Sequence, residues 1–399
     1  MQKFIDVSKL EFEGTDRYLV ITTAYPHPRQ LYKNGFIHRR VKAYMERDLK
    51  VDIFVLHPAY TKSEMYVFEG VHVYRGTEEH LRDFLKYEAH MKALIHFATP
   101  KMVNAILDVR KDMPIITWIH GYETEAWHRR WFNFLDSPTS LRRILEMADN
   151  YYSEQLSFMN WFYQTEELNT TFVHISKWFK EHIAECDARA VSKRALIIPN
   201  VIDEELFNYI EKPTEQRMNI LSIRPYASRK YANDMSVDAV LELSKRPFFN
   251  RLNFEFYGEG PLFDELTNKI NQFSNVKIHK GFLSQNQIAD VHKRNGIFLC
   301  PTRLDSQGVS MCEAMSSGLV PISTNITAIP EFVEHDVSGL LTKPESPIDI
   351  ADAVERLYFN PDVFSRISNN AAISIREKCA KNKVINKEID LITDYERSN

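Results

Sequence analysis

The sequence has few cysteines and places none of them in close pairs. Its 399 residues include four, Cys186, Cys300, Cys312 and Cys379, and no two form a Cys-x-x-Cys motif. Structural zinc sites usually take thiolate ligands from such pairs, and disulfide-stabilised domains are small and rich in cysteine. Neither a zinc site nor a disulfide framework is therefore indicated, and the composition fits a reducing cytoplasm.

Long apolar runs are also absent. No stretch of about 18 apolar residues is present to span a bilayer. The start of the chain, Met-Gln-Lys-Phe-Ile-Asp, lacks the apolar segment of a signal peptide. We therefore expect a cytoplasmic protein that is soluble or peripheral at the inner face of the membrane.

Charge of one sign is not in excess either. The chain has 50 Lys and Arg against 54 Asp and Glu, for a formal net charge of -4. A nucleic-acid-binding domain is expected to be basic, so nucleic acid is not a predicted partner. With 399 residues, of which 44% are hydrophobic, the chain is long enough for two domains of roughly 200 residues each.

The first half of the sequence alternates short apolar runs with helical patterns. Residues 18–23 and 51–56 read as buried strands on either side of a helix over residues 36–49. Later strands of this half are expected over residues 114–119, 171–175 and 195–198. Alternating strands and helices predict a parallel sheet covered by helices, with ligands bound where the strands end.

The second half repeats this pattern after a polar stretch, residues 203–219, which we interpret as an interdomain linker. Its strands are expected over residues 219–223, 253–257, 276–279, 297–300 and 319–323. Two similar α/β domains in tandem predict a cleft between them. From Lys381 on, apolar residues recur at helical spacing, so the last segment is expected to be a helix docked on an apolar surface.

One stretch of the second half combines a strand end, a glycine and two carboxylates. It runs from Asp305 to Glu313, Asp-Ser-Gln-Gly-Val-Ser-Met-Cys-Glu, and Glu313 is expected in the first turn of a helix. Backbone N–H groups at a helix start favour an anion such as phosphate, and carboxylates accept hydrogen bonds from sugar hydroxyls. The stretch therefore suits a nucleotide-linked sugar. The alternative is an ordinary first-turn acid and an ordinary turn residue.

Two cations open the second domain. Arg224 lies at a strand end and Lys230 follows six residues later, close enough for both to reach one diphosphate. Fixed cations can stabilise the charge that develops on a departing diphosphate, as a metal ion does elsewhere. No Asp-x-Asp pair lies in a loop typical of metal sites, and Glu123-Thr-Glu125 is the nearest equivalent, so we predict chemistry without a metal. The alternative is that both cations are simply solvated.

Aromatic and basic residues are concentrated in Trp127-His-Arg-Arg-Trp-Phe-Asn-Phe. Trp127, Arg129 and Arg130 are candidates for an acceptor site. The alternatives are contact with a membrane interface, where Trp and Arg are favoured, and ordinary packing of aromatic helices. The helix expected after the first strand carries a second basic group that includes Arg39 and Arg40. We expect a solvated face there, with anionic lipid as the alternative.

Taken in order, these motifs resemble the retaining glycosyltransferase family 4 (glycosyl transferases group 1), which has the GT-B fold. The residues that carry the resemblance are His120-Gly121, Pro199-Asn200 with Asp203, Arg224 with Lys230, Gly258-Glu-Gly-Pro261, Asp305 to Glu313 with Gly308, Ala314-Met315, Gly318, Pro321, Ile329-Pro330-Glu331 and Gly339-Leu340. The resemblance spans about residues 18–342. It implies two tandem Rossmann-like domains and transfer of a sugar from a nucleotide-diphosphate donor to a glycan or lipid-linked acceptor.

The resemblance also implies roles for residues of the second domain. Arg224 and Lys230 would hold the diphosphate of the donor. Glu313 would bind the ribose hydroxyls, and Asp305 would contact the hydroxyls of the transferred sugar. Backbone N–H groups near Gly308, Val309 and Ser310 would meet the donor's sugar and phosphates.

The resemblance also implies roles for residues outside this set. His120 would reach from the first domain toward the donor sugar, Gly35 would belong to a loop near the phosphates, and Phe282 would contact the nucleobase. The implied catalytic set is His120, Asp305, Arg224 and Lys230. No cofactor or metal is implied, because the nucleotide sugar is a co-substrate. The implied domains are residues 1–203 for the acceptor, 204–380 for the donor, and a helix over 381–399 that packs back on the first domain.

Some residues depart from the family pattern. Asp305 stands where the family has Glu, which shortens its reach by one methylene, and Tyr231 stands where Gly is common. The donor is therefore expected to be unusual. Two other functions remain open at this point: a nucleotide-sugar epimerase of the same fold, and a non-catalytic sugar-binding module of a larger assembly.

Overall fold

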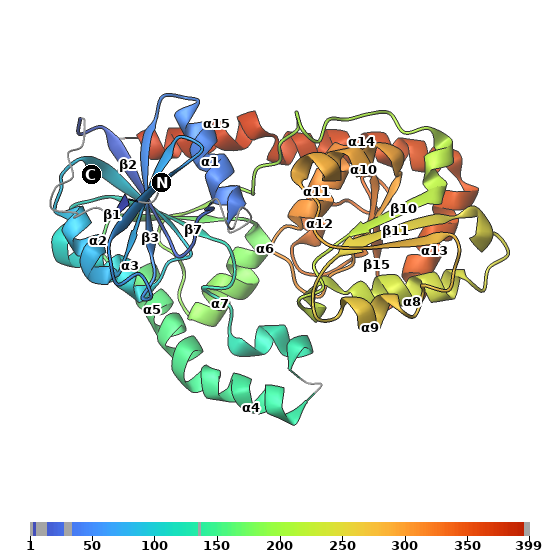
Figure 1. The fold of residues 1–399 in the computed structure, drawn as a ribbon, viewed down its shortest axis with the longest axis horizontal. Coiled ribbons are helices and arrows are strands. Elements are labelled where there is room, and N and C mark those ends of the chain that lie inside the picture. The colour runs from blue at the N-terminus through green and yellow to red at the C-terminus, as the bar shows by residue number, and fades with distance from the viewer. Residues whose placement is uncertain (1–2, 5–13, 28–33, 135–136, 395–399) are drawn as a thin grey trace. The chain divides into compact units, whose positions relative to one another are not determined.

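A computed structural model describes residues 3–4, 14–27, 34–134 and 137–394 of the chain (Figure 1). The chain forms two compact units. The first comprises Met1–Trp127, Leu145–Ile198 and Ile385–Asn399, and the second comprises His128–Ile144 and Pro199–Val384. Each unit is built around its own β-sheet, so each buries a core of its own.

The first unit has a nine-stranded sheet among its described residues, in the order β1-β4-β5-β3-β2-β6-β7-β8-β9. Its strands are β1 (Lys3–Phe4), β2 (Arg17–Thr22), β3 (Lys50–Leu56), β4 (Glu64–Phe68), β5 (Val71–Gly76), β6 (His90–His96), β7 (Ile115–Ile119), β8 (Thr170–His174) and β9 (Ala195–Ile197). All neighbouring strands from β5 to β9 in this order are parallel. The central strands are apolar on both faces, as a sheet covered by helices requires.

Helices of the first unit connect these strands and include its last segment. They are α1 (Gly35–Met45), α2 (Glu78–Leu85), α3 (Pro100–Val109), α5 (Ser153–Gln164), α6 (Lys177–Phe179), α7 (Glu185–Ala188) and the C-terminal part of α15 (Lys381–Thr393). The helix α4 (Pro138–Met147) precedes α5 and buries none of its residues. None of the described helices combines the length and the hydropathy needed to cross a bilayer.

A buried ion pair ties α1 to α15 within the first unit. Arg40 Nε donates to Glu388 Oε1 over 3.0 Å, and both side chains are fully buried. Tyr44 and Trp118 donate to the same carboxylate at 2.6 and 3.1 Å. The expectation that Arg40 lies on a solvated or lipid-facing surface is therefore wrong, because its partner comes from a helix more than 300 residues away in the sequence.

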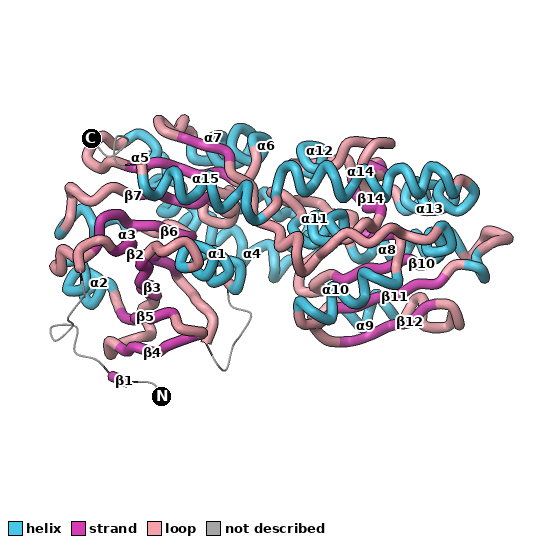
Figure 2. Tube along the Cα trace, turned by 90° about the horizontal axis from the view of Figure 1, so that it is seen from above, coloured by secondary structure: helices cyan, strands magenta, loops and turns pink. Residues whose placement is uncertain are grey.

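The second unit has a six-stranded parallel sheet among its described residues, in the order β12-β11-β10-β13-β14-β15. Its strands are β10 (Asn219–Ile223), β11 (Asn253–Gly258), β12 (Val276–Lys280), β13 (Ile297–Leu299), β14 (Val320–Thr324) and β15 (Leu340–Thr342). Figure 2 shows β10, β11 and β12 side by side. The ten strands predicted in the two units are all present with ends within one residue of those expected, so the two-domain α/β prediction is confirmed.

Helices cover both faces of the second sheet. They are α8 (Asn233–Leu243), α9 (Phe263–Thr267), α10 (Gln285–Arg294), α11 (Val309–Ser316), α12 (Ile329–Phe332), α13 (Pro347–Phe359) and α14 (Pro361–Cys379). Figure 1 shows α8 and α9 on one face and α10, α11 and α14 on the other. The stretch interpreted as a linker packs against this unit, since Lys212 Nζ donates to the His292 carbonyl at 2.6 Å and Phe207 is buried.

Candidate functional site

Several of the predicted site residues of the second unit lie at the carboxyl ends of its strands. Arg224 directly follows β10, Gly258 ends β11, and the loop that leads to Asp305 follows β13. The three strands are neighbours and run parallel, so their carboxyl ends share one edge of the sheet. That edge is where ligands of open α/β sheets bind.

Arg224 is the buried cation of this edge, with 4% of its surface exposed. Its Nη1 donates to Ser310 Oγ at 2.8 Å, and its guanidinium lies 5.0 Å from the centre of the Tyr231 ring. Its Nε is buried and has no acceptor among the residues that the structure describes. A buried N–H group without an acceptor costs free energy, which an oxygen of a bound anion would recover.

Asp305 is partly buried beside two positive charges. Its Oδ1 accepts hydrogen bonds from the backbone N–H groups of Gly308 at 2.9 Å and Gln307 at 3.2 Å. Burial alone would raise the pKa of this carboxyl. The charges of Lys230 and Arg224, together with the two backbone hydrogen bonds, outweigh burial and hold the pKa below its usual value. Asp305 is therefore an ionised acceptor at neutral pH.

Lys230 lies in a single 3₁₀ turn, Arg229–Tyr231, which Ser228 caps by accepting from the Lys230 N–H at 3.1 Å. The Lys230 carbonyl accepts from Thr302 Oγ1 at 3.0 Å and from the Arg303 N–H at 2.9 Å. These bonds fix the turn to the loop that follows β13. Within the described part of the chain, neither Arg224 nor Lys230 forms an ion pair with a carboxylate within 4.0 Å. Two fixed cations without direct counter-ions are suited to a phosphate group.

The helix that follows Asp305 begins earlier than expected. Gly308 has φ +79° and directly precedes α11, whose first residues are Val309 and Ser310. A Cβ at this position would lie 3.2 Å from Ile329 Cδ1, in a backbone conformation that favours glycine. Glu313 is therefore in the second turn of α11 and not in its first, which corrects the expectation from sequence. Its side chain is largely buried.

Gly260 allows the loop after β11 to approach the loop after β10 closely. Its φ is +147°, and a Cβ there would lie 2.3 Å from the carbonyl carbon of Tyr226. The Tyr226 N–H donates to the Glu259 carbonyl at 2.9 Å. The loops after β10 and β11 thus touch through their backbones, and this contact holds the segment just after Arg224.

His120 ends β7 in the first unit and is paired with a second histidine. Its Nε2 lies 2.9 Å from Nδ1 of His96, and the two rings stack with their centres 5.2 Å apart. Burial, with the positive charge of Arg40 added, lowers the pKa of His120 well below its usual value, so the ring is neutral at pH 7. The ring of Phe36, next to Gly35, lies 5.0 Å from that of His120. The structure therefore brings Gly35 and His120 together within their own unit.

Glu123 was considered from sequence only as part of a possible metal pair, and the structure gives it another task. Its two oxygens accept from the backbone N–H groups of His120 at 2.7 Å and Gly121 at 3.1 Å. Burial raises the pKa of this carboxyl to about 7, although these hydrogen bonds act in the opposite direction. Glu123 thus fixes the turn that carries His120. An acid three residues after a strand-end His-Gly was the signal that could have found it.

Gln307 and His96 were missed by the sequence analysis. Gln307 is buried, accepts from the Asn200 N–H at 2.6 Å and donates to the Asn200 carbonyl at 3.1 Å, so it ties the Asp305 loop to Pro199-Asn200. Its place beside Asp305 gave no sign of this. His96 was missed because the strand β6, which it ends, was not recognised.

The remaining predicted residues are Phe282 and three residues of the segment 127–133. The last residue of that segment contacts the Lys230 turn, since Asn133 Oδ1 accepts from Ser228 Oγ at 2.8 Å and from the Arg229 N–H at 3.2 Å. Phe282 follows β12 and is 63% exposed on the surface of the second unit. Trp127, Arg129 and Arg130 belong to a short 3₁₀ helix, η2 (Trp127–Asn133), in which Trp131 is exposed and Phe132 is buried. No group of three or more His, Cys, Asp or Glu side chains in the described ranges is arranged to hold a metal ion.

Two Rossmann-like units with parallel sheets give this chain the GT-B fold of glycosyltransferases. Residues 207–373 match the sequence model of the glycosyl transferases group 1, so this segment is similar to that family. The match covers the strands, loops and helices that position Arg224, Lys230, Asp305 and Glu313.

Known proteins are similar to this chain over part of its sequence or in fold. The chain is 23% identical over 200 residues to an uncharacterized glycosyltransferase of Methanocaldococcus jannaschii, covering 49% of this chain and 52% of that protein. This chain thus spans about half the length of that relative. Among solved structures, the sucrose-phosphate synthase of Thermosynechococcus elongatus aligns with a TM-score of 0.69 at 12% identity, over 94% of this chain and 98% of the other. An Anabaena protein solved with UDP and glucose aligns with a TM-score of 0.65 at 13% identity, over 94% and 99%.

Proposed function

We propose that this protein is a retaining glycosyltransferase of family 4, which moves a sugar from a nucleotide-diphosphate donor to a glycan or lipid-linked glycan. The observation that carries the proposal is the cluster at the carboxyl edge of the second sheet. There Arg224 has a buried N–H without an acceptor, Lys230 lies nearby, and both hold Asp305 ionised. A diphosphate would meet the two cations, and Asp305 would accept from a sugar hydroxyl.

In the proposed reaction the bond between the sugar's anomeric carbon and the diphosphate oxygen breaks. The electron pair stays on the diphosphate, and an oxocarbenium-like sugar results. The acceptor hydroxyl then forms its bond to the same face of that carbon, and its proton passes to the departing phosphate. Arg224 and Lys230 stabilise the charge that develops on the diphosphate, so no metal ion is needed for that step.

The other predicted residues take supporting roles in the proposal. Glu313 binds the ribose hydroxyls, the N–H groups near Gly308, Val309 and Ser310 meet the donor, and Phe282 contacts the nucleobase. His120 acts on the donor sugar from the first unit. The neutral ring that burial imposes on His120 can donate one hydrogen bond to a sugar hydroxyl without adding charge.

The acceptor side of the proposal rests on the aromatic and basic segment at Trp127, Arg129 and Arg130. We propose that the acceptor belongs to a cell-surface polysaccharide or its lipid-linked precursor, and that the protein contacts the inner face of an anionic membrane. Arg40 takes no part in this contact because it is fully buried against Glu388. The cation-rich segment and the exposed ring of Trp131 are the observations that favour the membrane.

Binding of the donor tests the proposal most directly. A panel of nucleoside diphosphates and their sugars should include one that raises the unfolding temperature, because a ligand at 100 times its Kd stabilises the folded state by about 2.7 kcal/mol. The stabilising nucleotide sugar is then incubated with candidate glycan acceptors, and the product's anomeric configuration is read by NMR. A product of inverted anomeric configuration would contradict the proposal, as would the absence of stabilisation by any nucleotide at millimolar concentration.

A further inference from the structure

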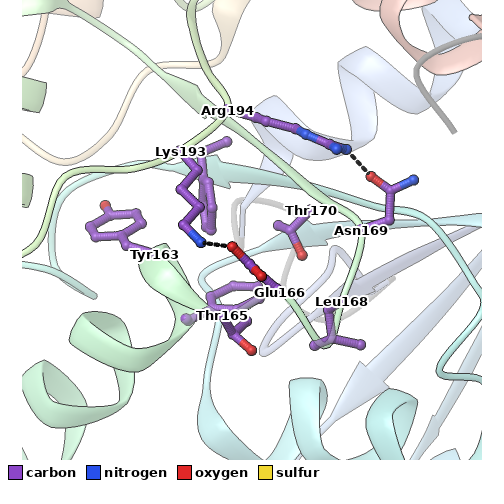
Figure 3. Close-up of a pocket in the computed structure, with 10 residues that line it drawn as sticks. Tyr163, Thr165, Glu166, Leu168, Asn169, Thr170, Lys193 and Arg194 are labelled. Carbon is purple, nitrogen blue, oxygen red and sulfur yellow. Dashed lines mark hydrogen bonds and ion pairs between the residues drawn. The ribbon is translucent and has the colours of Figure 1, made fainter. Parts of the chain in front are cut away.

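A cavity lies in the first unit at the edge of the sheet opposite to His120. It has a volume of about 410 Å³ and is enclosed by the end of α5, the loop of residues 165–169, the start of β8 and the residues just before β9 (Figure 3). His120 follows the carboxyl end of β7, whereas Thr170 is the first residue of its parallel neighbour β8. A cavity of several hundred Å³ is large enough for a small molecule.

The charged side chains of this cavity leave one cation without a carboxylate. Lys193 Nζ pairs with Glu166 Oε1 at 2.7 Å, but 49% and 87% of these side chains are exposed. Such a surface pair is weak and can open to a ligand. Arg194 donates to the amide oxygen of Asn169, and the described residues include no carboxylate in ion pair with it. The cavity therefore has a net positive charge.

Two buried hydroxyls in the cavity wall lack hydrogen-bond partners. Thr170 is 7% exposed and Tyr163 is 1% exposed, and neither Thr170 Oγ1 nor the Tyr163 hydroxyl has a partner among the described residues. In Figure 3, Thr170, Glu166 and Lys193 converge on the same side of the cavity. A buried hydroxyl without a partner costs free energy in the empty site, and a ligand oxygen beside Thr170 would recover it.

The rest of the wall is apolar. Phe162, Leu168 and Phe172 line the cavity and are themselves buried. A ligand that fills the space must therefore cover apolar side chains as well as meet a cation and a hydroxyl. Inorganic ions alone would leave the apolar wall uncovered. An apolar molecule alone would leave Arg194 without a carboxylate or other anion and Thr170 Oγ1 without a partner among the described residues.

We propose that this cavity binds a small organic anion, in which a phosphate or carboxylate group meets Arg194, Lys193 and the Thr170 hydroxyl while an apolar ring covers Phe162 and Leu168. The site is separate from the donor edge in the second unit and does not depend on the proposed transfer reaction. Its ligand would bind without occupying the positions of Arg224 or Asp305.

Titration of phenyl phosphate tests the site. It is carried out by calorimetry on the Arg224→Ala/Lys230→Ala double variant, which removes both cations of the donor edge, and this double variant is the parent for the substitutions below. Binding should weaken at least tenfold in Arg194→Gln, since a hydrogen bond to a charged group contributes about that factor or more. Thr170→Val should also weaken binding while leaving the empty protein as stable or more stable, because the orphaned hydroxyl is removed. Lys111→Gln, which alters a nearby exposed pair with Glu167 outside the cavity, should bind as the parent does.

Benzoate, phenol and inorganic phosphate complete the experiment. Benzoate binding more tightly than phenyl phosphate assigns a carboxylate ligand, and the reverse order assigns a phosphate ligand. Phenol binding as tightly as either anion would refute the proposal, as would equal affinities for phenyl phosphate in Arg194→Gln and its parent. Absence of any heat with both anions at millimolar concentration would also refute it, whether or not the protein transfers sugar.

Discussion

Two buried arginines, one in each unit, differ in how their charge is met. Arg40 Nε donates directly to the carboxylate of Glu388, which also accepts from Tyr44 and Trp118. Arg224 has no carboxylate in contact within the described residues and donates instead to the hydroxyl of Ser310. The charge of Arg40 is thus neutralised by a carboxylate of the protein, whereas the charge of Arg224 is fixed in position and available to a ligand.

This difference separates a structural charge from a ligand-binding one. Removing a partner from a buried ion pair leaves an uncompensated charge, so Arg40 and Glu388 should matter for stability. A buried cation without a carboxylate in direct contact carries a cost of burial, which the oxygens of a bound anion can offset. Arg224 should therefore matter for binding and much less for stability.

The largest expected effect is that of Glu388→Ala. It leaves Arg40 buried without its carboxylate, so the free energy of unfolding should fall by about 3–5 kcal/mol. Urea denaturation measures this change. Lys86→Ala, which breaks an exposed pair with Asp83, is the matched control and should cost below about 1 kcal/mol. Equal losses of unfolding free energy in the two variants would contradict a structural role for the Arg40–Glu388 pair. A changed nucleotide affinity in Glu388→Ala, measured at a temperature where this variant is folded, would contradict it too.

The second largest expected effect is on the rate of sugar transfer. Arg224→Ala and Lys230→Ala should each lower kcat by about 10²–10³, or 2.7–4 kcal/mol in the barrier, because each removes a cation from the developing charge on the diphosphate. The unfolding free energy should change much less than in Glu388→Ala, since Asp305 keeps its two backbone hydrogen bonds and the charge of the other cation. Initial rates with the identified donor, together with urea denaturation, measure both quantities.

Arg294→Ala is the control for these two variants. It removes an exposed guanidinium of the same unit that pairs with Glu255, so transfer should be unchanged. Full activity in Arg224→Ala or Lys230→Ala would contradict the assignment of the donor edge. A large loss of stability in either variant would instead place that cation with Arg40 as a structural charge.

Sequence alone predicted the elements whose signals are local and missed the contacts that are not. Runs such as residues 219–223 are apolar and bounded by polar loops, so the strands were found within one residue. The hairpin of β4 and β5 was not recognised, although its turn, Glu69-Gly70, has positive φ at both residues, as a two-residue hairpin requires. Arg40 was misjudged because nothing near it in the sequence reveals Glu388.

The donor edge shows the same limit. Arg224 and Asp305 were named as site residues because each follows an apolar run, and the parallel sheet then brings the run ends together. The start of α11 was misplaced by four residues because Gly308 was read as a loop residue, whereas its positive φ makes it the cap of the helix. The partners of Gln307 and His96 depend on tertiary contacts that no spacing encodes, whereas Glu123 accepts from groups only two and three residues before it.

Glu123 extends the comparison of buried charges to a carboxylate. Among the described residues, backbone N–H groups and no cation donate to its side chain. Its pKa is raised from 4.5 to about 7, so the folded state takes up a proton that the unfolded state has lost. Stability from this group is fully present below about pH 4.5 and is lost as pH rises through 7. As the pH rises from about 4.5 to 7, the free energy of unfolding of the native protein should fall by up to ~3 kcal/mol relative to that of Glu123→Gln. This follows because one pKa unit corresponds to about 1.4 kcal/mol.

Thermal unfolding of both proteins at several pH values measures this difference. Arg110→Ala, at the end of α3 in the same unit, is the control, and its stability should run parallel to that of the native protein over this pH range. A constant gap between the native protein and Glu123→Gln from pH 4.5 to 8 would show that burial does not perturb this carboxyl.

Asp305 gives the smallest effect and the opposite sign. The cations Lys230 and Arg224 hold its pKa below the ordinary value of about 3.9, so the folded state favours the ionised carboxyl. The resulting stability is fully present above about pH 4 and is lost as pH falls through the folded-state pKa. Asp305→Asn should therefore be less stable than the native protein at neutral pH, with a difference in unfolding free energy that narrows below pH 4.

In a Lys230→Ala background this difference should be smaller at every pH, because one of the two charges that stabilise the carboxylate is gone. Measured by thermal unfolding, a difference unaffected by Lys230→Ala would mean that Lys230 does not help to keep Asp305 ionised, and that Arg224 and the backbone N–H groups of Gln307 and Gly308 do so without it.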